Sequence, residues 1–214
     1  MNVITISRYL NSGGITIGKR VAEELSYKFV TKETIEEIMS QYGMVNFDSV
    51  YESAPGFLDR LDHFQEDMVR FHRKVIQALA VHGRVVILGR GSFAVFPDYS
   101  DVLNVRLWAP LEVRVKRLMT KTNNTSWRQC MDDVTAHDRI RRAYVERWFH
   151  GHPDRANAFD LVINTAKVPS ESAVSIIVDS AVKSGYLDLE KHKKLSELEV
   201  DTVLMETVNK ILDS

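Results

Sequence analysis

Short apolar runs alternate along this chain with longer segments whose apolar residues recur at helical spacing. The short runs are rich in valine, isoleucine and leucine, and helical patterns separate nearly all of them. Such alternation is typical of an α/β fold with a parallel, doubly wound sheet and helices on both faces. The pattern predicts strands over residues 2–6, 27–30, 84–88, 103–108 and 160–164.

Helical spacing accounts for most of the remaining chain. One helix is expected directly after the first strand, and others are expected over residues 32–41, 57–82, 111–119, 126–149 and 170–184. Residues 186–214 also place leucines and valines at roughly helical intervals. This helical C-terminal extension forms either two helices packed on a domain of residues 1–185 or a homodimerisation element, and the pattern does not choose between them.

Composition narrows the class of protein. The chain has 214 residues, of which 44% are hydrophobic and 27% charged, and its formal net charge is −1. The balanced charge favours neither nucleic acid nor an anionic membrane as a partner. The single cysteine, Cys130, excludes an internal disulfide and a cysteine-based metal cluster. Because no apolar run is long enough to span a bilayer and no secretory signal pattern is present, we expect a cytoplasmic protein.

A glycine-containing turn separates the first strand from the first helix. Gly13 and Gly14 allow backbone N–H groups to surround an anion, and the helix N-terminus adds partial positive charge. The pattern of a phosphate-binding P-loop, G-x-x-x-x-G-K-[ST], is nevertheless not met. Aligned on Gly13, the first glycine is Arg8, the lysine is Gly14 and the next hydroxyl is Thr16, one place late. The loop is therefore expected to have the shape of a P-loop without its usual charge.

Two nearby cations are candidates to replace the missing lysine. Arg8 occupies the first-glycine position and could fold over bound phosphates, although a salt bridge at the strand end fits it equally well. Lys19 stands one turn further into the helix, where a solvated residue is the more natural assignment. The sequence leaves the source of the positive charge open.

Arginines recur at two further places. The strand expected over 84–88 ends in Gly89-Arg90-Gly91, and ligands of open parallel sheets sit beyond the carboxyl ends of strands. Arg90 is thus expected to face the same crevice as the glycine loop and to hold a phosphate through two parallel hydrogen bonds. In the helix over 126–149, Arg139 and Arg142 share a face, whereas Arg141 points elsewhere. The alternative for these arginines is an ordinary solvated face with ion pairs.

Three collinear segments resemble the cytidylate kinases, and more closely their diverged cytidylate kinase-like branch. The first segment runs over residues 4–25 and includes Ser12-Gly13-Gly14. The second joins Gly89-Arg90 and the Val-Phe-Pro-Asp sequence at 95–98 to residues 105–114. The third joins the Asp-Arg-Ile-Arg sequence at 138–141 and Tyr144 to residues 159–165. Together the segments cover about residues 2–184.

This resemblance implies a three-layer nucleoside-monophosphate-kinase-like fold of the P-loop class, with a five-stranded parallel sheet and an arginine lid at about residues 120–158. It implies ATP as the donor, with Mg²⁺ bridging donor phosphate oxygens mostly through its own waters and with no protein metal site. Arg90 would hold the acceptor monophosphate. Arg139 and Arg142, with Arg141 as a weaker candidate, would come from the lid. The donor phosphates would be held by Ser12, Gly13, Gly14 and Thr16.

Several positions depart from the family pattern. Gly14 replaces the loop lysine, while Leu88 and Gly91 replace aspartates of the true cytidylate kinases. Thr31, a candidate acceptor contact in the nucleotide-recognition region, stands where the diverged branch usually has an aspartate. Thr31 and Gly91 weaken the case for cytosine as the base of the acceptor.

The expected function is an ATP-dependent phosphotransferase that phosphorylates a nucleoside monophosphate such as CMP. The glycine loop, Arg90 and the lid arginines favour such an enzyme. Gly14, Leu88 and Thr31 favour a different class, a catalytically weak or inactive protein that kept the kinase fold to sense a nucleotide or another anion. A kinase of another small acceptor is the third possibility.

Overall fold

Five short strands pair side by side, and the three central ones bury side chains on both of their faces. The computed structural model describes residues 2–47, 50, 62–97, 99–183 and 193–213. Its strands form one parallel sheet in the order β2-β3-β1-β4-β5, which confirms the predicted fold class. The strands are β1 (Val3–Arg8), β2 (Lys28–Val30), β3 (Val85–Leu88), β4 (Val102–Trp108) and β5 (Leu161–Asn164).

β1 continues two residues beyond the predicted end. Ser7 and Arg8 still pair with Arg106 and Leu107 of β4, although their polar side chains do not extend the apolar run. Polar residues at the carboxyl end of this buried strand are therefore part of the sheet. The pairing places the guanidinium groups of Arg8 and Arg106 at the carboxyl ends of β1 and β4.

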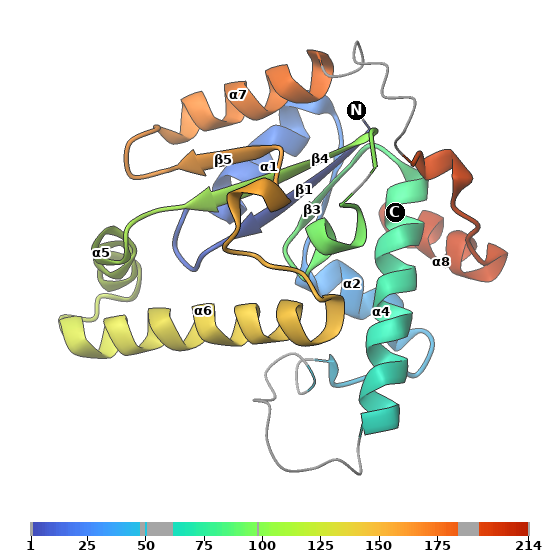
Figure 1. The fold of residues 1–214 in the computed structure, drawn as a ribbon, viewed down its shortest axis with the longest axis horizontal. Helices are drawn as coiled ribbons and strands as arrows, with labels where there is room; N and C mark the ends of the chain where they lie inside the picture. The colour runs from blue at the N-terminus through green and yellow to red at the C-terminus, as the bar shows by residue number, and fades with distance from the viewer. Residues whose placement is uncertain (1, 48–49, 51–61, 98, 184–192, 214) are drawn as a thin grey trace.

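Helices cover both faces of the sheet (Figure 1). α1 (Gly14–Leu25) and α7 (Ser170–Lys183) pack on one face against Ile4, Ile6 and their neighbours. α2 (Lys32–Ser40), α4 (Asp62–His82), α6 (Trp127–Phe149) and α8 (Thr202–Asp213) pack on the other, and α5 (Leu111–Thr122) packs against α6. Short 3₁₀ turns are η1 (Ser92–Val95), η2 (Ala156–Ala158) and η4 (Leu195–Glu197). Among the described residues, no helix is long and apolar enough to cross a membrane.

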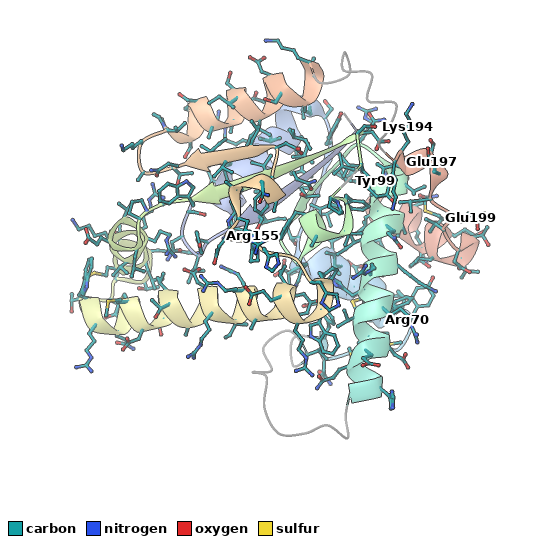
Figure 2. The ribbon with its side chains drawn as sticks, viewed as in Figure 1. Arg70, Tyr99, Arg155, Lys194, Glu197 and Glu199 are labelled. Atoms are coloured by element: carbon teal, nitrogen blue, oxygen red, sulfur yellow. The ribbon has the colours of Figure 1, made fainter. Side chains whose placement is uncertain are left out.

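The described part of the C-terminal extension packs against the rest of the chain. α8 buries Leu204, Val208 and Leu212 against α4 and α2. The hydroxyl groups of Tyr42 and Thr207 lie 2.9 Å apart, and η4 lies near Tyr99, just before β4 (Figure 2). The sequence pattern allowed two helices, but residues 193–213 contain one α-helix and a 3₁₀ turn. The division at residue 185 and homodimerisation stay predictions.

One histidine of α4 is buried among aromatic rings. The Nδ1 atom of His72 lies 3.0 Å from the hydroxyl of Tyr144 on α6, and the His72 ring lies 4.6 Å from the ring of Phe47. Burial, reinforced by the positive charges of Arg90 and Arg73, lowers the pKa of His72 to about 3. His72 is thus neutral in the folded protein and links α4 to α6 as a polar group within the core.

The packing of α8 is testable with two valines of the same helix. Val208 is 0% exposed and Val203 is 58% exposed. Val208→Ala is expected to lower the free energy of unfolding by about 1.5–3 kcal/mol, since it removes two buried methyl groups and leaves a cavity. Val203→Ala should change it by less than about 0.5 kcal/mol. Urea unfolding measures both values, and equal effects would contradict the packing of α8 on α4.

The depressed pKa of His72 predicts a pH-dependent stability. Below pH ~6.5 the unfolded chain binds a proton at this histidine and the folded protein does not. The free energy of unfolding should therefore fall by about 1.4 kcal/mol per pH unit from this residue as the pH drops from ~6.5 towards 3. His72→Gln should remove this contribution to the slope, measured by urea unfolding between pH 7 and 5. The matched control, His63→Gln at an exposed position of α4, should retain the slope.

Candidate functional site

The carboxyl ends of three adjacent strands converge at one edge of the sheet. β3, β1 and β4 are neighbours, so the residues that follow them share one crevice. The residues at this edge are Arg8 at the end of β1 and Tyr9 after it, the Gly89-Arg90-Gly91 turn after β3, and Trp108 at the end of β4. α6 runs across the same side of the molecule (Figure 1).

The glycine loop presents the start of α1 to this crevice. Gly13 is the N-cap with φ +83°, a left-handed conformation that favours glycine, and no side chain caps the helix. The N–H groups of the first turn, which have no partner inside a helix, are thus available to an anion. The Ser12 hydroxyl instead lies 2.8 Å from the carbonyl oxygen of Tyr9 and 3.2 Å from that of Leu107, so Ser12 fixes the loop to the sheet.

A cavity of about 460 Å³ opens beside this loop. Its volume is in the range of small-molecule sites. Arg117 of α5 borders the cavity and is held in place by donating a 2.7 Å hydrogen bond to the carbonyl oxygen of Thr165. Thr16 is exposed on the first turn of α1, at the edge of the cavity. The remaining lining residues include Arg8, Tyr9, Gly13, Gly14, Lys121, Arg141 and Ser170.

Five arginines line a second, adjoining cavity of about 30 Å³: Arg8, Arg90, Arg106, Arg141 and Arg142. We call this set the arginine cradle. Arg90, 4% exposed, donates a 2.6 Å hydrogen bond to Glu36 of α2 and lies 5.4 Å from the ring centre of Phe47. The cavity volume is sufficient for at least one water molecule.

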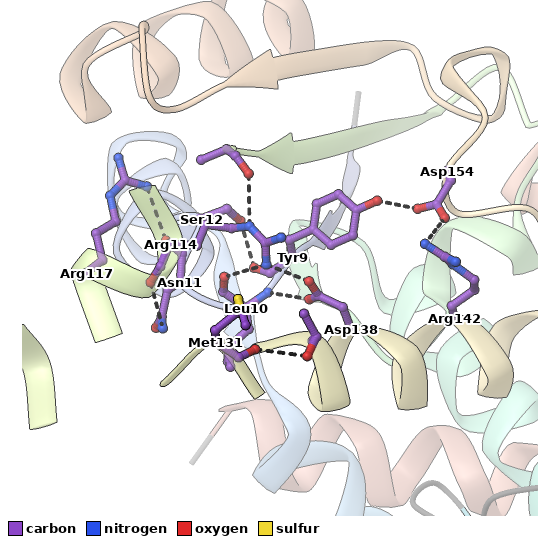
Figure 3. Close-up of polar contacts among 12 residues, drawn as sticks. Tyr9, Leu10, Asn11, Ser12, Arg114, Arg117, Met131, Asp138, Arg142 and Asp154 are labelled. Atoms are coloured by element: carbon purple, nitrogen blue, oxygen red, sulfur yellow. Dashed lines mark hydrogen bonds and ion pairs between the residues drawn. The ribbon is translucent and has the colours of Figure 1, made fainter. Parts of the chain in front are cut away.

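Asp154 joins three members of the site, and Figure 3 shows its contacts with two of them, Tyr9 and Arg142. Its carboxylate accepts a 2.5 Å hydrogen bond from the Tyr9 hydroxyl and lies 2.5 Å from Arg142 and 3.4 Å from Arg106. Burial first, and the hydrogen bond to Asp154 second, raise the pKa of Tyr9. Burial lowers the pKa of Arg106, which also donates a 2.7 Å hydrogen bond to the hydroxyl of Ser7.

A second carboxylate ties α6 to the glycine loop. Asp138 accepts a 3.1 Å hydrogen bond from the backbone N–H of Leu10 and pairs with Arg114 at 2.5 Å (Figure 3). The guanidinium groups of Arg114 and Arg106 lie 4.7 Å and 4.2 Å from the ring centre of Tyr9. Tyr9 is therefore held between two cations, whose attraction to the ring face fixes its orientation.

The arginines of α6 that border the cavities are not the pair that the sequence favoured. Arg141 lines both cavities and Arg142 lines the cradle, whereas Arg139 is exposed and borders neither. The buried residues Val134 and Val145 set the inward face of α6, and Arg141 and Arg142 lie closer to that face than Arg139 does. The spacing of Arg139 and Arg142 shows that they share one face of the helix, but it does not show which face of the helix is buried. The roles of all three arginines stay predictions.

Two other predicted site residues lie outside the cavities. Lys19 is exposed and its ammonium group lies 3.9 Å from Glu23, one turn along the same helix. Thr31 is the N-cap residue of α2, where its hydroxyl donates a 2.6 Å hydrogen bond to Glu33. Neither borders the described cavities, so the structure does not bring them together with the glycine loop and Arg90.

Sequence reasoning missed several polar residues of the site. Arg106 had a usable signal, since a charged residue interrupts a mostly apolar strand, and such a residue needs a partner. Asp154 and Glu36 gave no comparable signal because isolated carboxylates in surface segments are common. Their partners, Tyr9 and Arg90, lie 145 and 54 positions away.

The chemistry of the site suits phosphate groups and gives little to bind a metal directly. In the described ranges, no group of three or more histidine, cysteine, aspartate or glutamate residues could hold a metal ion. Mg²⁺ commonly keeps several waters and binds through substrate phosphates, so it does not require such a cluster. The Thr16 hydroxyl and the first-turn N–H groups are of the kind that accompany a Mg²⁺-bound nucleotide phosphate.

Solved structures with the same fold include an uncharacterized protein from Eubacterium ventriosum, with a TM-score of 0.68 and 17% identity. The match covers 86% of this chain and 99% of that one. The protein TT1252 from Thermus thermophilus has a TM-score of 0.52 and 14% identity, and the match covers 85% of this chain and 96% of that one. At these identities the similarity shows the fold alone.

Relatives of similar length are cytidylate kinases. The cytidylate kinase of Ignicoccus hospitalis is 29% identical over 177 residues, covering 83% of this chain and 97% of the relative. That of Saccharolobus islandicus is 25% identical over 179 residues, covering 82% and 88%. The sequence model of the cytidylate kinase-like family matches residues 3–167. The chain therefore belongs to the cytidylate kinase-like family.

Proposed function

We propose that the protein transfers the γ-phosphoryl group of ATP to a nucleoside monophosphate such as CMP. Family membership and fold support a nucleotide-kinase-like phosphotransferase. One observation carries the finer proposal: the cavity beside the glycine loop and the arginine cradle share Arg8, Tyr9 and Arg141. A donor phosphate bound at the start of α1 and an acceptor phosphate bound in the cradle would meet at these shared residues.

Each part of the site has a chemical task in this reaction. The N–H groups at the start of α1 hold the donor phosphates, and Arg90 holds the acceptor phosphate. An acceptor phosphate oxygen forms a bond to the γ-phosphorus of ATP, and the bond from that phosphorus to the β–γ bridging oxygen breaks, releasing ADP. Arg141 and Arg142 neutralise the charge that spreads over the transferring oxygens. Catalysis is then positioning and electrostatics, without a covalent protein intermediate.

Mg²⁺ supplies charge neutralisation on the donor phosphates when it is bound. Thr16 is the protein residue that would contact it, because its hydroxyl lies in the first turn of α1 at the edge of the larger cavity. The other coordination positions would be filled by phosphate oxygens and water.

The ion pair between Arg90 and Glu36 favours a second candidate function. A protein that senses an anion without turnover needs an arginine whose partner the anion replaces, and Arg90 has such a partner at 2.6 Å. In this case ATP or a monophosphate binds but is not converted. A kinase of a non-nucleotide acceptor would use the same cradle with a different acceptor body.

A coupled assay of ADP release separates these functions. Purified protein is given ATP and Mg²⁺ with a panel of nucleoside monophosphates and, separately, with small phosphorylated and hydroxylated acceptors. The proposed function predicts ADP release that depends on a nucleoside monophosphate. Binding of ATP without acceptor-dependent release favours the sensor, and release with a non-nucleotide acceptor alone favours the third function.

The position of the lid arginines makes a specific prediction about rate. Arg141→Gln is expected to lower kcat by about 10²–10³, because it removes a cation that borders both cavities. Arg139→Gln, which removes an exposed arginine from the same helix, should lower kcat by less than about threefold. Steady-state ADP release gives both values. A larger loss of kcat in Arg139→Gln than in Arg141→Gln would contradict this prediction and would support the helix face predicted from spacing.

A further inference from the structure

Arg8 crosses the glycine loop at the position where a P-loop carries its lysine. A Cβ atom added to Gly14 would lie 2.8 Å from Cγ, 3.2 Å from Cβ and 3.4 Å from Cδ of Arg8. Real Cβ atoms do not approach other carbons as closely as the shortest of these distances. The stem of Arg8 therefore occupies the space into which any side chain at position 14 would project.

The guanidinium group of Arg8 occupies the space beside a second glycine, Gly89. A Cβ atom added to Gly89 would overlap Nη1 of Arg8 and lie 2.7 Å from its Cζ. Gly89 has φ +75° and stands directly before Arg90. The Arg8 guanidinium thus lies against the backbone of the Gly89-Arg90-Gly91 turn.

In the side-chain conformation that Arg8 adopts, these contacts leave no room for a loop lysine. In the pattern G-x-x-x-x-G-K-[ST], the first glycine and the lysine correspond to positions 8 and 14 of this chain. A glycine at position 8 would leave room for a side chain at position 14, whereas the Arg8 stem fills that space. The absence of the first glycine and the absence of the lysine are thus linked.

We propose that Arg8 is the catalytic cation of the loop and replaces the P-loop lysine by contacting the donor phosphate, with Gly14 and Gly89 making room for its side chain. The proposal rests on the proposed function and names the residue that completes its donor site. Arg8 borders both cavities, so its guanidinium can contact a phosphoryl group on its way between them. Lys19, exposed and beside Glu23, does not reach either cavity.

Calorimetry with ATP and Mg²⁺ is the first test, because it requires no turnover. Arg8→Ala is expected to weaken ATP binding by about 10–100-fold, the loss of one charged hydrogen-bonding group. Arg20→Ala is the matched control, since it removes an arginine from the adjacent helix that pairs with Glu171 outside the cavities. Unchanged ATP affinity in Arg8→Ala would overturn the proposal, as would an equal loss in Arg20→Ala.

An exchange of residues is the second test. Arg8→Gly alone should weaken ATP binding as Arg8→Ala does. Adding Gly14→Lys to Arg8→Gly should raise the ATP affinity at least tenfold over that of Arg8→Gly, because the lysine then enters the space that Arg8 left. Gly14→Ala in the native background should weaken ATP binding by displacing the Arg8 stem, but it should have no further effect in Arg8→Ala. Thermal unfolding confirms that each variant is folded before its affinity is compared. Independent, additive effects of positions 8 and 14 would overturn the proposed exchange.

The two proposals fail in different ways. If the native protein binds ATP but releases no ADP with any acceptor, the proposed function fails while the calorimetric test of Arg8 still stands. If ADP is released with a nucleoside monophosphate and Arg8→Ala leaves both ATP affinity and kcat unchanged, the proposed function stands and the role of Arg8 is disproved.

Discussion

Guanidinium groups gathered at one edge of a sheet repel each other, and much of the structure around the site serves to hold them there. Arg90 is paired by Glu36 of α2, Arg114 by Asp138 of α6, and Arg106 and Arg142 by Asp154. None of these carboxylates lies on a strand. The ion pairs thus fix α2 to the turn after β3, α6 to α5, and the segment after α6 to both β4 and α6. Removing one carboxylate would leave a buried guanidinium group without its opposite charge, which is costly.

Tyr9 shows how the same constraint shapes the loop. Its ring lies between Arg106 and Arg114, and its hydroxyl donates to Asp154. The negative faces of an aromatic ring separate two cations while attracting both. Tyr9 therefore links the end of β1 to the segment that follows α6 and orients the loop that begins α1. The position of the glycine loop depends on the arginines as much as on its own glycines.

The fold could be predicted from the sequence because local patterns determine it. Each of the five strands was predicted within two residues of its observed ends, as apolar runs followed by turns or helix starts are strong signals. The glycine loop and Arg90 were also placed at the same edge, because the topology of a parallel sheet dictates this. The sequence favoured Arg139 and Arg142 over Arg141, whereas Arg141 and Arg142 border the cavities, because residue spacing does not show which face of α6 is buried. The partners Glu36 and Asp154 meet their arginines through contacts that no local pattern records.

The pairing of the cradle arginines also bears on how a phosphate could bind. Glu36 pairs with Arg90, and Asp154 pairs with Arg106 and Arg142. A phosphate bound in the cradle could take the place of a carboxylate on Arg90 or Arg142, since both groups accept parallel hydrogen bonds from a guanidinium group.

Such an exchange would affect α2 and the segment that follows α6. Glu36 belongs to α2, and Asp154 lies between α6 and η2. If a phosphate took over their arginines, these carboxylates would no longer hold α2 to the turn after β3 or the segment after α6 to β4, and the phosphate itself would become the shared partner. The mutual repulsion of the arginines, which the carboxylates offset in the protein alone, would then be offset by the ligand.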